Sequence, residues 1–169
     1  MPNESNIYSI RQGKDIALIF INDIMAVHSS AMYVYIKPLI EENKIKTIWI
    51  NLNKCKTIDS TTIGTLVKMH KMLEEKRGCL FLCNPSKDVK MNLEWMGLID
   101  FFNVQQKIVF TRIEKRFMND IPLLKGRLTS EFVLDALEEI LKISPHLKEE
   151  YKKLFNILHQ DIKKKKHKK

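Results

Sequence analysis

The chain has few residues of the kinds that define specialised protein classes. Among its 169 residues are 3 cysteines, 5 glycines and 5 prolines. Three cysteines are too few for a disulfide-stapled fold and favour a reducing compartment. The low glycine and proline content excludes collagen-like and low-complexity chains. No apolar run approaches the roughly 18 residues that a membrane-spanning helix needs.

Enough apolar sequence is present for a packed core, because hydrophobic residues make up 44% of the chain and charged residues 29%. The first five residues are polar and lack the basic-then-apolar order of a signal peptide. We therefore expect a soluble, cytoplasmic protein with one ordinary domain and an appendage.

The positive charge is concentrated at the C-terminus. The formal net charge is +9, and residues 163–169 contribute six lysines and no acidic residue. Without this segment the excess of basic residues falls to three. Such a segment is typical of a solvated, disordered tail that binds anionic surfaces weakly. The charge therefore does not by itself indicate a specific nucleic-acid function.

The first two thirds of the chain alternate between strand and helix patterns. Apolar, β-branched runs predict strands at residues 8–11, 16–21, 45–52, 79–83 and 104–110, the first two forming a hairpin. Helical spacing predicts helices from Ser29 or Ser30, over residues 61–77, and after the Asn84–Pro85–Ser86 turn. Pro38 predicts a break near Lys37, and residues 53–58 are predicted to form a loop.

Strands and helices in this order predict an α/β fold with a largely parallel sheet, because parallel neighbours need crossover connections. Gly78 and Gly97 are expected to end the second and third helices. We place this domain at residues 1–113, an amphipathic helical extension at 114–162, and the lysine-rich disordered tail at 163–169.

The extension contains two predicted helices. Ser130 is expected to cap the first, and Ser144–Pro145 interrupts before the second. Their apolar stripes must bury against something. These stripes pack either against the first domain, where they form part of its core, or against a second copy or a partner, where they form a docking surface.

The residues indicate no catalytic centre. Cys55 lies between two lysines, which favours a thiolate, but no base accompanies it, and a plain loop cysteine explains it. Cys79 and Cys83 share one face of a strand and are explained by core packing. The histidines lack paired metal-ligand spacing. We therefore expect neither an enzyme, nor a metal site, nor a cofactor.

Two stretches carry a family likeness. Residues 48–66, IWINLNKCKTIDSTTIGTL, open a helix with an Asp–Ser pair after a strand, and residues 80–102, LFLCNPSKDVKMNLEWMGLIDFF, follow at a suitable distance. Together they resemble the STAS domain, found in bacterial anti-sigma factor antagonists and in the cytoplasmic part of sulfate transporters. The likeness covers roughly residues 8–112 and implies a mixed, largely parallel STAS-like sheet.

The resemblance implies a binding switch. In the antagonists, an anti-sigma factor with serine kinase activity phosphorylates the serine after the aspartate, and the unmodified antagonist binds that kinase. Carried over, Ser60 is the expected phosphorylation site, and Asp59, Ser60, Thr61 and Thr62 form the expected partner-binding segment. A helix N-terminus favours a phosphate, because free amides and the helix dipole face it. The implied function is bacterial transcription regulation through protein–protein interaction.

Two positions depart from the family pattern. Thr62 stands where the family usually has glycine, and Asn51 stands where an aspartate often ends the preceding strand. Thr61 and Thr62 also carry hydroxyls and are alternative phosphoacceptors. Without the resemblance, Asp59 and Ser60 are explained as a helix cap. The same residues can serve both as the cap and as the phosphorylation switch.

Two other hypotheses remain. One is a STAS-like scaffold without phosphorylation, a subunit of a membrane transport or signalling assembly whose lysine tail touches anionic lipid. The other is an RNA- or DNA-binding protein that works through the tail. The C-terminal helices are also candidates for a homodimer interface.

Overall fold

A six-stranded sheet lies at the centre of the computed structural model, which describes residues 6–106, 119–122 and 128–169. The strand order is β5-β4-β3-β2-β1-β6. β2 to β5 are mutually parallel, and β1 is antiparallel to both of its neighbours. The strands are β1 Ile7–Gln12, β2 Asp15–Ile24, β3 Thr47–Ile58, β4 Cys79–Cys83, β5 Asn103–Gln105 and β6 Asn119–Asp120. The predicted mixed, largely parallel α/β fold is confirmed.

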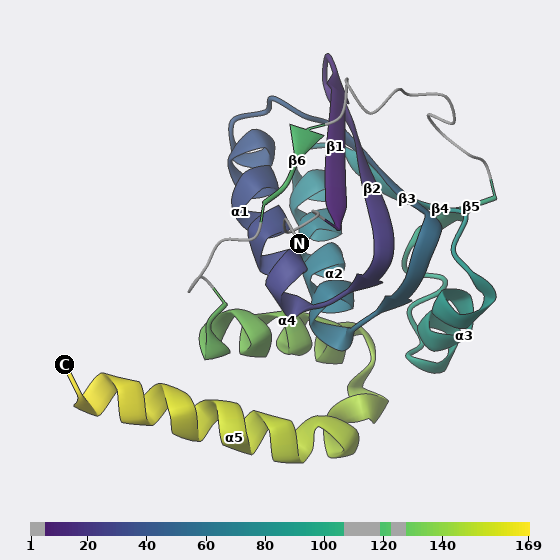
Figure 1. Cartoon of the computed structure of the whole chain (residues 1–169). Coiled ribbons are helices and arrows are strands. Elements are labelled where there is room, and N and C mark those ends of the chain that lie inside the picture. The colour runs from purple at the N-terminus through teal and green to yellow at the C-terminus, as the bar shows by residue number, and fades with distance from the viewer. Residues whose placement is uncertain (1–5, 107–118, 123–127) are drawn as a thin grey trace.

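Helices connect the parallel strands. They are α1 Ala26–Glu41, α2 Ser60–Glu75 and α3 Lys87–Trp95. α1 and α2 lie side by side against the sheet, and α3 lies near its β4–β5 edge (Figure 1). Fully buried apolar side chains fill the space between these layers, among them Phe20, Ile36, Ile50, Leu66 and Leu82. Each such burial stabilises the fold by about 1.5–3 kcal/mol.

Local turn signals in the sequence are confirmed at the β1–β2 hairpin and at the two ends of α3. β1 and β2 form the expected hairpin, and Gly13 takes the positive φ of +61° in its turn. Ser86 caps α3 by accepting a hydrogen bond from the Val89 amide at 3.2 Å, and Gly97, with φ of +70°, follows the helix as predicted. β5 confirms the start of the strand expected at 104–110, and the rest of that strand lies outside the described residues.

β3 is longer than predicted, and the loop expected at residues 53–58 is wrong. β2 also continues, to Ile24, and pairs with β3 as far as Ile58 through two register shifts. In this extended part Cys55 and Ile58 face the core while the residues between them are exposed. In this part of β3 only every third residue faces the core. A mostly polar sequence can therefore still form a strand here.

Helix boundaries also differ from prediction. α1 begins at Ala26, before the expected caps Ser29 and Ser30, both of which are buried within it. Pro38 lies inside α1 without breaking it. The carbonyl that loses its hydrogen bond belongs to Val34, which is 43% exposed, so water can replace the missing donor.

At the end of α2, Arg77 and not Gly78 has the left-handed backbone, with φ of 58°. A glycine is needed at position 78 for space, because a Cβ there would lie 2.3 Å from the Lys46 carbonyl oxygen.

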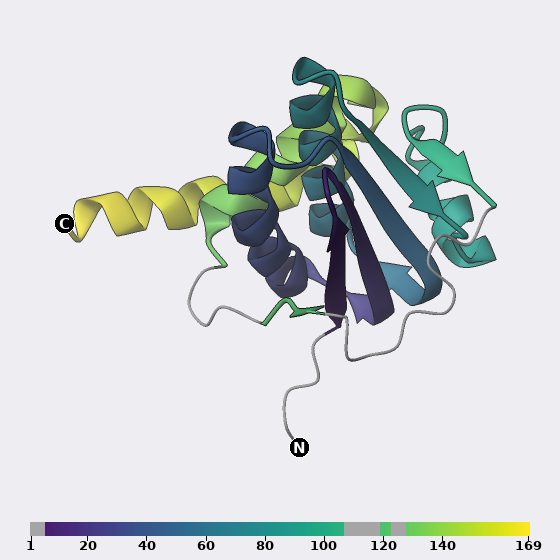
Figure 2. The same cartoon turned by 90° about the horizontal axis from the view of Figure 1, so that it is seen from above.

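The C-terminal part folds back onto the first domain. It consists of α4 Ser130–Ile143, a 3-10 turn Pro145–Leu147 and α5 Lys148–His167, which we call the arm. α4 packs against α2, and α5 packs against α4 as far as Asp161, whose carboxylate accepts the Ser130 hydroxyl, while the C-terminal end of α5 extends away from the molecule (Figures 1 and 2). Leu137 and Ile140 of α4 are fully buried. The core interpretation of this stripe therefore applies to α4.

Close packing and ion pairs hold α4 on α2. Gly64 and Ala136 meet at backbone distance, since a Cβ on Gly64 would lie 2.1 Å from the Ala136 carbonyl oxygen. Lys68 pairs with Asp135, and Lys71 pairs with Glu139 at 2.7 Å. Burial raises the pKa of Glu139, but hydrogen bonds from Lys142 and Lys71 outweigh it and hold the pKa below its ordinary value.

Two expectations about the arm need correction. The cap of α4 is Thr129, whose hydroxyl accepts the Phe132 amide at 3.1 Å, so Ser130 is the first helical residue. The lysine-rich segment expected as a disordered tail is helical through His167. Lysines are favoured in the last turn by the helix dipole, and Lys165 pairs with Asp161 at 2.8 Å. The boundary predicted at residue 113 lies outside the described residues.

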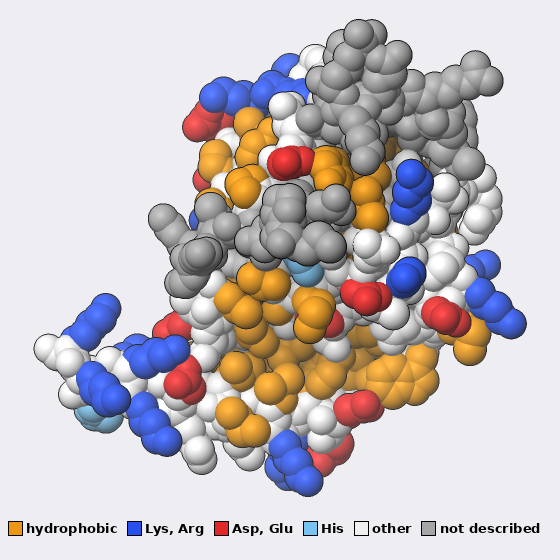
Figure 3. All heavy atoms as spheres, in the orientation of Figure 1, with side chains coloured by type: hydrophobic (Ala, Val, Ile, Leu, Met, Phe, Trp, Pro, Cys, Tyr) orange, Lys and Arg blue, Asp and Glu red, His pale blue; other side chains and the backbone are white. Residues whose placement is uncertain are grey.

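The surface of the arm combines charge and apolar side chains. Lysine side chains gather at the C-terminal end of α5 (Figure 3). Leu154 and Ile157 of α5 are 39% and 62% exposed. In the part of the chain that the structure describes, no helix is both long enough and apolar enough to cross a membrane.

The substitution Gly64→Ala tests the contact between α2 and α4. Alanine stabilises an uncrowded helix by about 1 kcal/mol relative to glycine, whereas overpacking costs about 1–3 kcal/mol. We expect the variant to unfold at a lower urea concentration than the unchanged protein. A gain in stability would contradict backbone contact at this crossing.

Candidate functional site

Asp59 joins the beginnings of two helices. It follows β3, and its Oδ1 accepts the Thr62 amide of α2 at 2.8 Å. Its Oδ2 accepts the Ala26 amide of α1 at 2.7 Å. The expected capping role is confirmed and is wider than predicted, because one carboxylate caps α2 and also binds the first residue of α1. The second contact has no local signal, since 33 residues separate the partners.

His28 belongs to the same corner. Its Nδ1 accepts the Met25 amide at 3.0 Å in the first turn of α1. Burial lowers the pKa of His28, although the Asp59 carboxylate and the Met25 backbone oppose this shift. The imidazole is therefore stabilised in its neutral form, in which Nδ1 can act as an acceptor.

The three neighbouring hydroxyls differ in exposure. Ser60, the first residue of α2, is half-buried. Thr61 is 7% exposed and Thr62 is fully buried. The Thr62 hydroxyl has no hydrogen-bond partner among the described residues. Of the three residues, Ser60 is therefore the most exposed.

Tyr151, in the first turn of α5, is the residue at this site that sequence reasoning did not assign. It is 8% exposed, and Ser60 is among the groups that influence its pKa. Burial raises the pKa of Tyr151; the Ser60 hydrogen bond opposes the shift, and the Glu150 carboxylate adds to it. The sequence pattern placed Tyr151 only on an apolar stripe, and nothing in it indicated the partner.

Asn51, expected at the end of a strand, lies within β3. It pairs with Ile19 of β2 and Cys83 of β4, and its side-chain oxygen accepts the Asn53 amide at 3.0 Å. The strand continues for seven more residues, to Ile58. Asn51 therefore belongs to the sheet and not to the turn that presents Ser60.

Cys55 is a core residue of β3, not a loop cysteine. Its thiol donates to the Thr57 carbonyl at 3.5 Å. Burial, with a further contribution from the Asp23 carboxylate, raises the pKa of Cys55 to about 12. Burial likewise raises the pKa of Cys83 to about 11. Both thiols are therefore protonated near neutral pH, and the flanking lysines do not activate Cys55.

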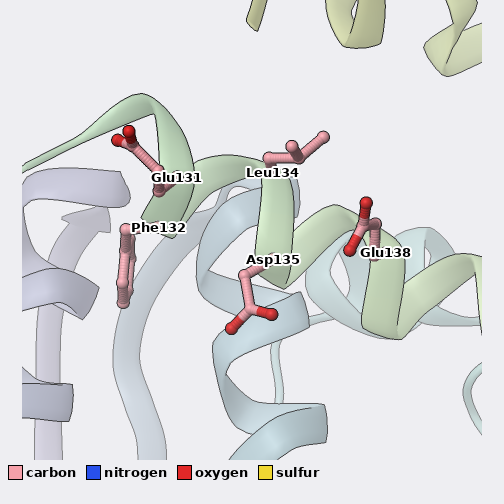
Figure 4. A pocket seen from close by; sticks show the side chains of 5 residues that line it. All are labelled: Glu131, Phe132, Leu134, Asp135 and Glu138. Atoms are coloured by element: carbon pink, nitrogen blue, oxygen red, sulfur yellow. The ribbon is translucent and has the colours of Figure 1, made fainter. Parts of the chain in front are cut away.

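An open hollow of about 410 Å³ runs along α4 and is lined by Glu131, Phe132, Leu134, Asp135 and Glu138. Figure 4 shows that these side chains point in different directions from one helix. Asp135 is already paired with Lys68. Over residues 6–106, 119–122 and 128–169, no group of three or more His, Cys, Asp or Glu residues is placed to hold a metal ion.

The strand-to-helix corner that carries Asp59 and Ser60 lies inside a family match. The family model of the STAS domain matches residues 9–111. The chain belongs to the STAS domain family. This confirms the resemblance seen in the sequence, and the arm lies outside the matched residues.

Solved structures show the same STAS fold. The anti-sigma factor antagonist SpoIIAA in its unphosphorylated form superimposes with a TM-score of 0.52 at 16% identity, over 60% of this chain and 87% of that chain. SpoIIAA from Bacillus in the phosphorylated form gives 0.50 at 17% identity, over 57% and 89%. A proposed anti-sigma factor antagonist from Thermotoga maritima gives 0.51 at 19% identity, over 60% and 86%.

Replacing Asp59 tests its double contact in the STAS domain. Asp59→Ala removes both acceptors and is expected to lower the free energy of unfolding by about 2 kcal/mol, since one cap contributes about 1 kcal/mol. Asp59→Asn keeps one side-chain oxygen as an acceptor, so we expect a smaller loss of unfolding free energy than for Asp59→Ala. Ser86→Ala, which removes the single cap of α3, is the matched control. Equal losses for Asp59→Ala and Ser86→Ala in urea denaturation would contradict the double role.

Thiol alkylation tests the burial of the cysteines. With pKa values of about 12 and about 11, less than about 1% of Cys55 and Cys83 is ionised at pH 8, and the thiolate is the reactive form. We expect both to resist iodoacetamide in the native protein and to react after denaturation, as measured by peptide mass spectrometry. Rapid native labelling of Cys55 would contradict its place in the core.

Proposed function

We propose that this STAS protein is a regulatory binding protein of the anti-sigma factor antagonist type, switched by phosphorylation of Ser60. The observation that carries the proposal is the position of Ser60. It is a half-buried serine at the start of α2, directly after the capping aspartate, in a domain of this family. The neighbouring threonines are buried.

The chemistry at Ser60 suits a phosphate. A kinase would transfer the γ-phosphoryl group of ATP to Ser60 Oγ, with release of the hydroxyl proton and ADP. Asp59 already accepts the Thr62 amide, while other first-turn amides and the helix dipole favour an anion. The added charge of about −2 then changes the surface that a partner meets, with the sheet unaltered.

The partner that this proposal implies is a protein, in particular an anti-sigma factor with serine kinase activity. The support comes from the fold neighbours, of which SpoIIAA is described as an anti-sigma factor antagonist in unphosphorylated and phosphorylated forms. Catalysis of the transfer would belong to that partner. The chain itself would act by binding, in the cytoplasm, and would not be an enzyme.

The decisive measurement is peptide-mapping mass spectrometry of the protein isolated with its bound proteins from its own cells. We expect phosphate on Ser60 and none on Thr61 or Thr62, together with a co-purifying ATP-binding kinase. With that partner in hand, Ser60→Ala should retain binding. Ser60→Asp should weaken it by at least about tenfold, because like charges opposed in an interface are costly. Ser86→Asp is the matched charge control.

The competing function is a STAS scaffold without phosphorylation, and the observation that favours it is that the Ser60 side chain is partly withdrawn from solvent. In that case Ser60→Ala and Ser60→Asp bind the partner equally. Absence of phosphate at residues 60–62 under several growth conditions would contradict the switch and leave the scaffold.

A further inference from the structure

One face of α5 carries apolar side chains at the middle of the helix that the rest of the chain leaves open. α5 runs from Lys148 to His167, so Ile157 lies at its midpoint. Ile157 is 62% exposed, and Leu154, three residues earlier, is 39% exposed. Figure 3 shows hydrophobic side chains over α4 and the middle of α5. Two exposed apolar residues are ordinary on a protein surface, and it is the charges around them that identify the occupant.

The charges on this face form a pattern that is complementary to itself. In chain order the face carries Glu150, Lys153, Leu154, Ile157, Asp161 and Lys164. Their spacings of three and four residues place these side chains on one side of a helix. The order is negative, positive, apolar, apolar, negative, positive. An antiparallel copy of the same helix therefore presents a positive charge opposite each negative one.

We propose that α5 pairs with α5 of a second copy of this chain, antiparallel, about a two-fold axis at Ile157. A two-fold interface brings residue i of one chain against residue j of the other, and j against i. Ile157 then packs on its own copy. Glu150 and Lys164 lie seven residues to either side of Ile157, so Glu150 of each chain faces the partner's Lys164.

A second ion pair forms closer to the axis. Lys153 and Asp161 lie four residues to either side of Ile157, so Lys153 faces the partner's Asp161. Asp161 already accepts the Ser130 hydroxyl and pairs with Lys165 at 2.8 Å. A carboxylate has about four lone-pair sites, so Asp161 can accept Lys153 as well.

The other charged groups of this face are available to a partner. Glu150, Lys153 and Lys164 form no ion pair with another residue in the part of the chain that the structure describes. Each can therefore turn to a second copy without breaking an ion pair of its own molecule.

The lysine-rich end of α5 favours the antiparallel arrangement. A parallel pair would set the six lysines of residues 163–169 beside six identical ones. In the antiparallel pair, Lys163 and its copy are about 18 Å apart along the axis, at a rise of about 1.5 Å per residue. Salt screens exposed charges beyond about 8 Å. The C-terminal end of α5 also extends away from its own molecule (Figures 1 and 2), which leaves room for the partner beside it.

Sedimentation velocity on the full chain, below and above about 1 μM, tests the pairing. A helix pair is smaller than the standard interface of about 800 Å² per partner, so we expect a dissociation constant at or above about 1 μM. Ile157→Asp sets two carboxylates against each other and should weaken the dimer by at least about tenfold. Ile157 is exposed, so the monomer stays folded. Lys152→Glu, an exposed charge on another side of α5, is the matched control and should change nothing.

Charge reversal tests the register. Glu150→Lys and Lys164→Glu each oppose like charges twice, so each variant alone should dimerise at least about tenfold more weakly. An equimolar mixture of the two variants restores opposite charges at both places and should form heterodimers as tight as the unchanged dimer. The double variant should recover in the same way, which a folding defect would not allow.

A chain that stays monomeric up to about 1 mM would overturn the pairing. Equal dissociation constants for the unchanged protein and Ile157→Asp would overturn it too, as would single charge variants whose mixture shows no recovery. A monomer that instead binds phosphatidylserine vesicles, and loses this binding on Ile157→Asp, would overturn the dimer and assign the face to a lipid surface. None of these outcomes depends on phosphate at Ser60.

Discussion

The carboxylate of Asp59 is the interaction on which the rest of the structure depends. β2 and β3 run parallel to the same edge of the sheet, and α1 and α2 begin there. One oxygen of Asp59 caps α2 and the other binds the start of α1. α4 packs on α2, and α5 packs on α4. The position of the arm therefore depends on the position of α2, whose first turn Asp59 caps. Ser60 therefore lies where the sheet, the helical layer and the arm meet.

Elements marked by local signals could be predicted from the sequence. The hairpin around Gly13, the cap at Ser86, the positive φ at Gly97 and the short strand Cys79–Cys83 each depend on residues next to one another. The alternation of strands and helices gave the sheet class, because parallel strands need crossovers. The Asp–Ser pair of the candidate site belongs to this group too, since its cap spans only three residues.

Features that depend on distant partners could not be predicted. Residues 53–58 are mostly polar and by themselves predict a loop, and only pairing with the extended β2 makes them strand. The start of α1 is shifted because Asp59, far along the chain, binds the Ala26 amide. The contact of Lys71 with Glu139 joins residues that lie 68 positions apart. Periodicity shows that a residue is inward-facing, but it does not show which residue it faces.

Gly64 restricts which helices can lie against α2. A glycine is needed at position 64, because a Cβ there would meet the backbone of Ala136 on the partner helix. Lys68 and Lys71 further require carboxylates one residue before and three residues after it, where Asp135 and Glu139 stand. This face of α2 thus combines a close backbone approach with two matched charges. The arm, being tethered, meets it at an effective concentration of about millimolar order, so a free helix of the same pattern would have to exceed that level to displace it.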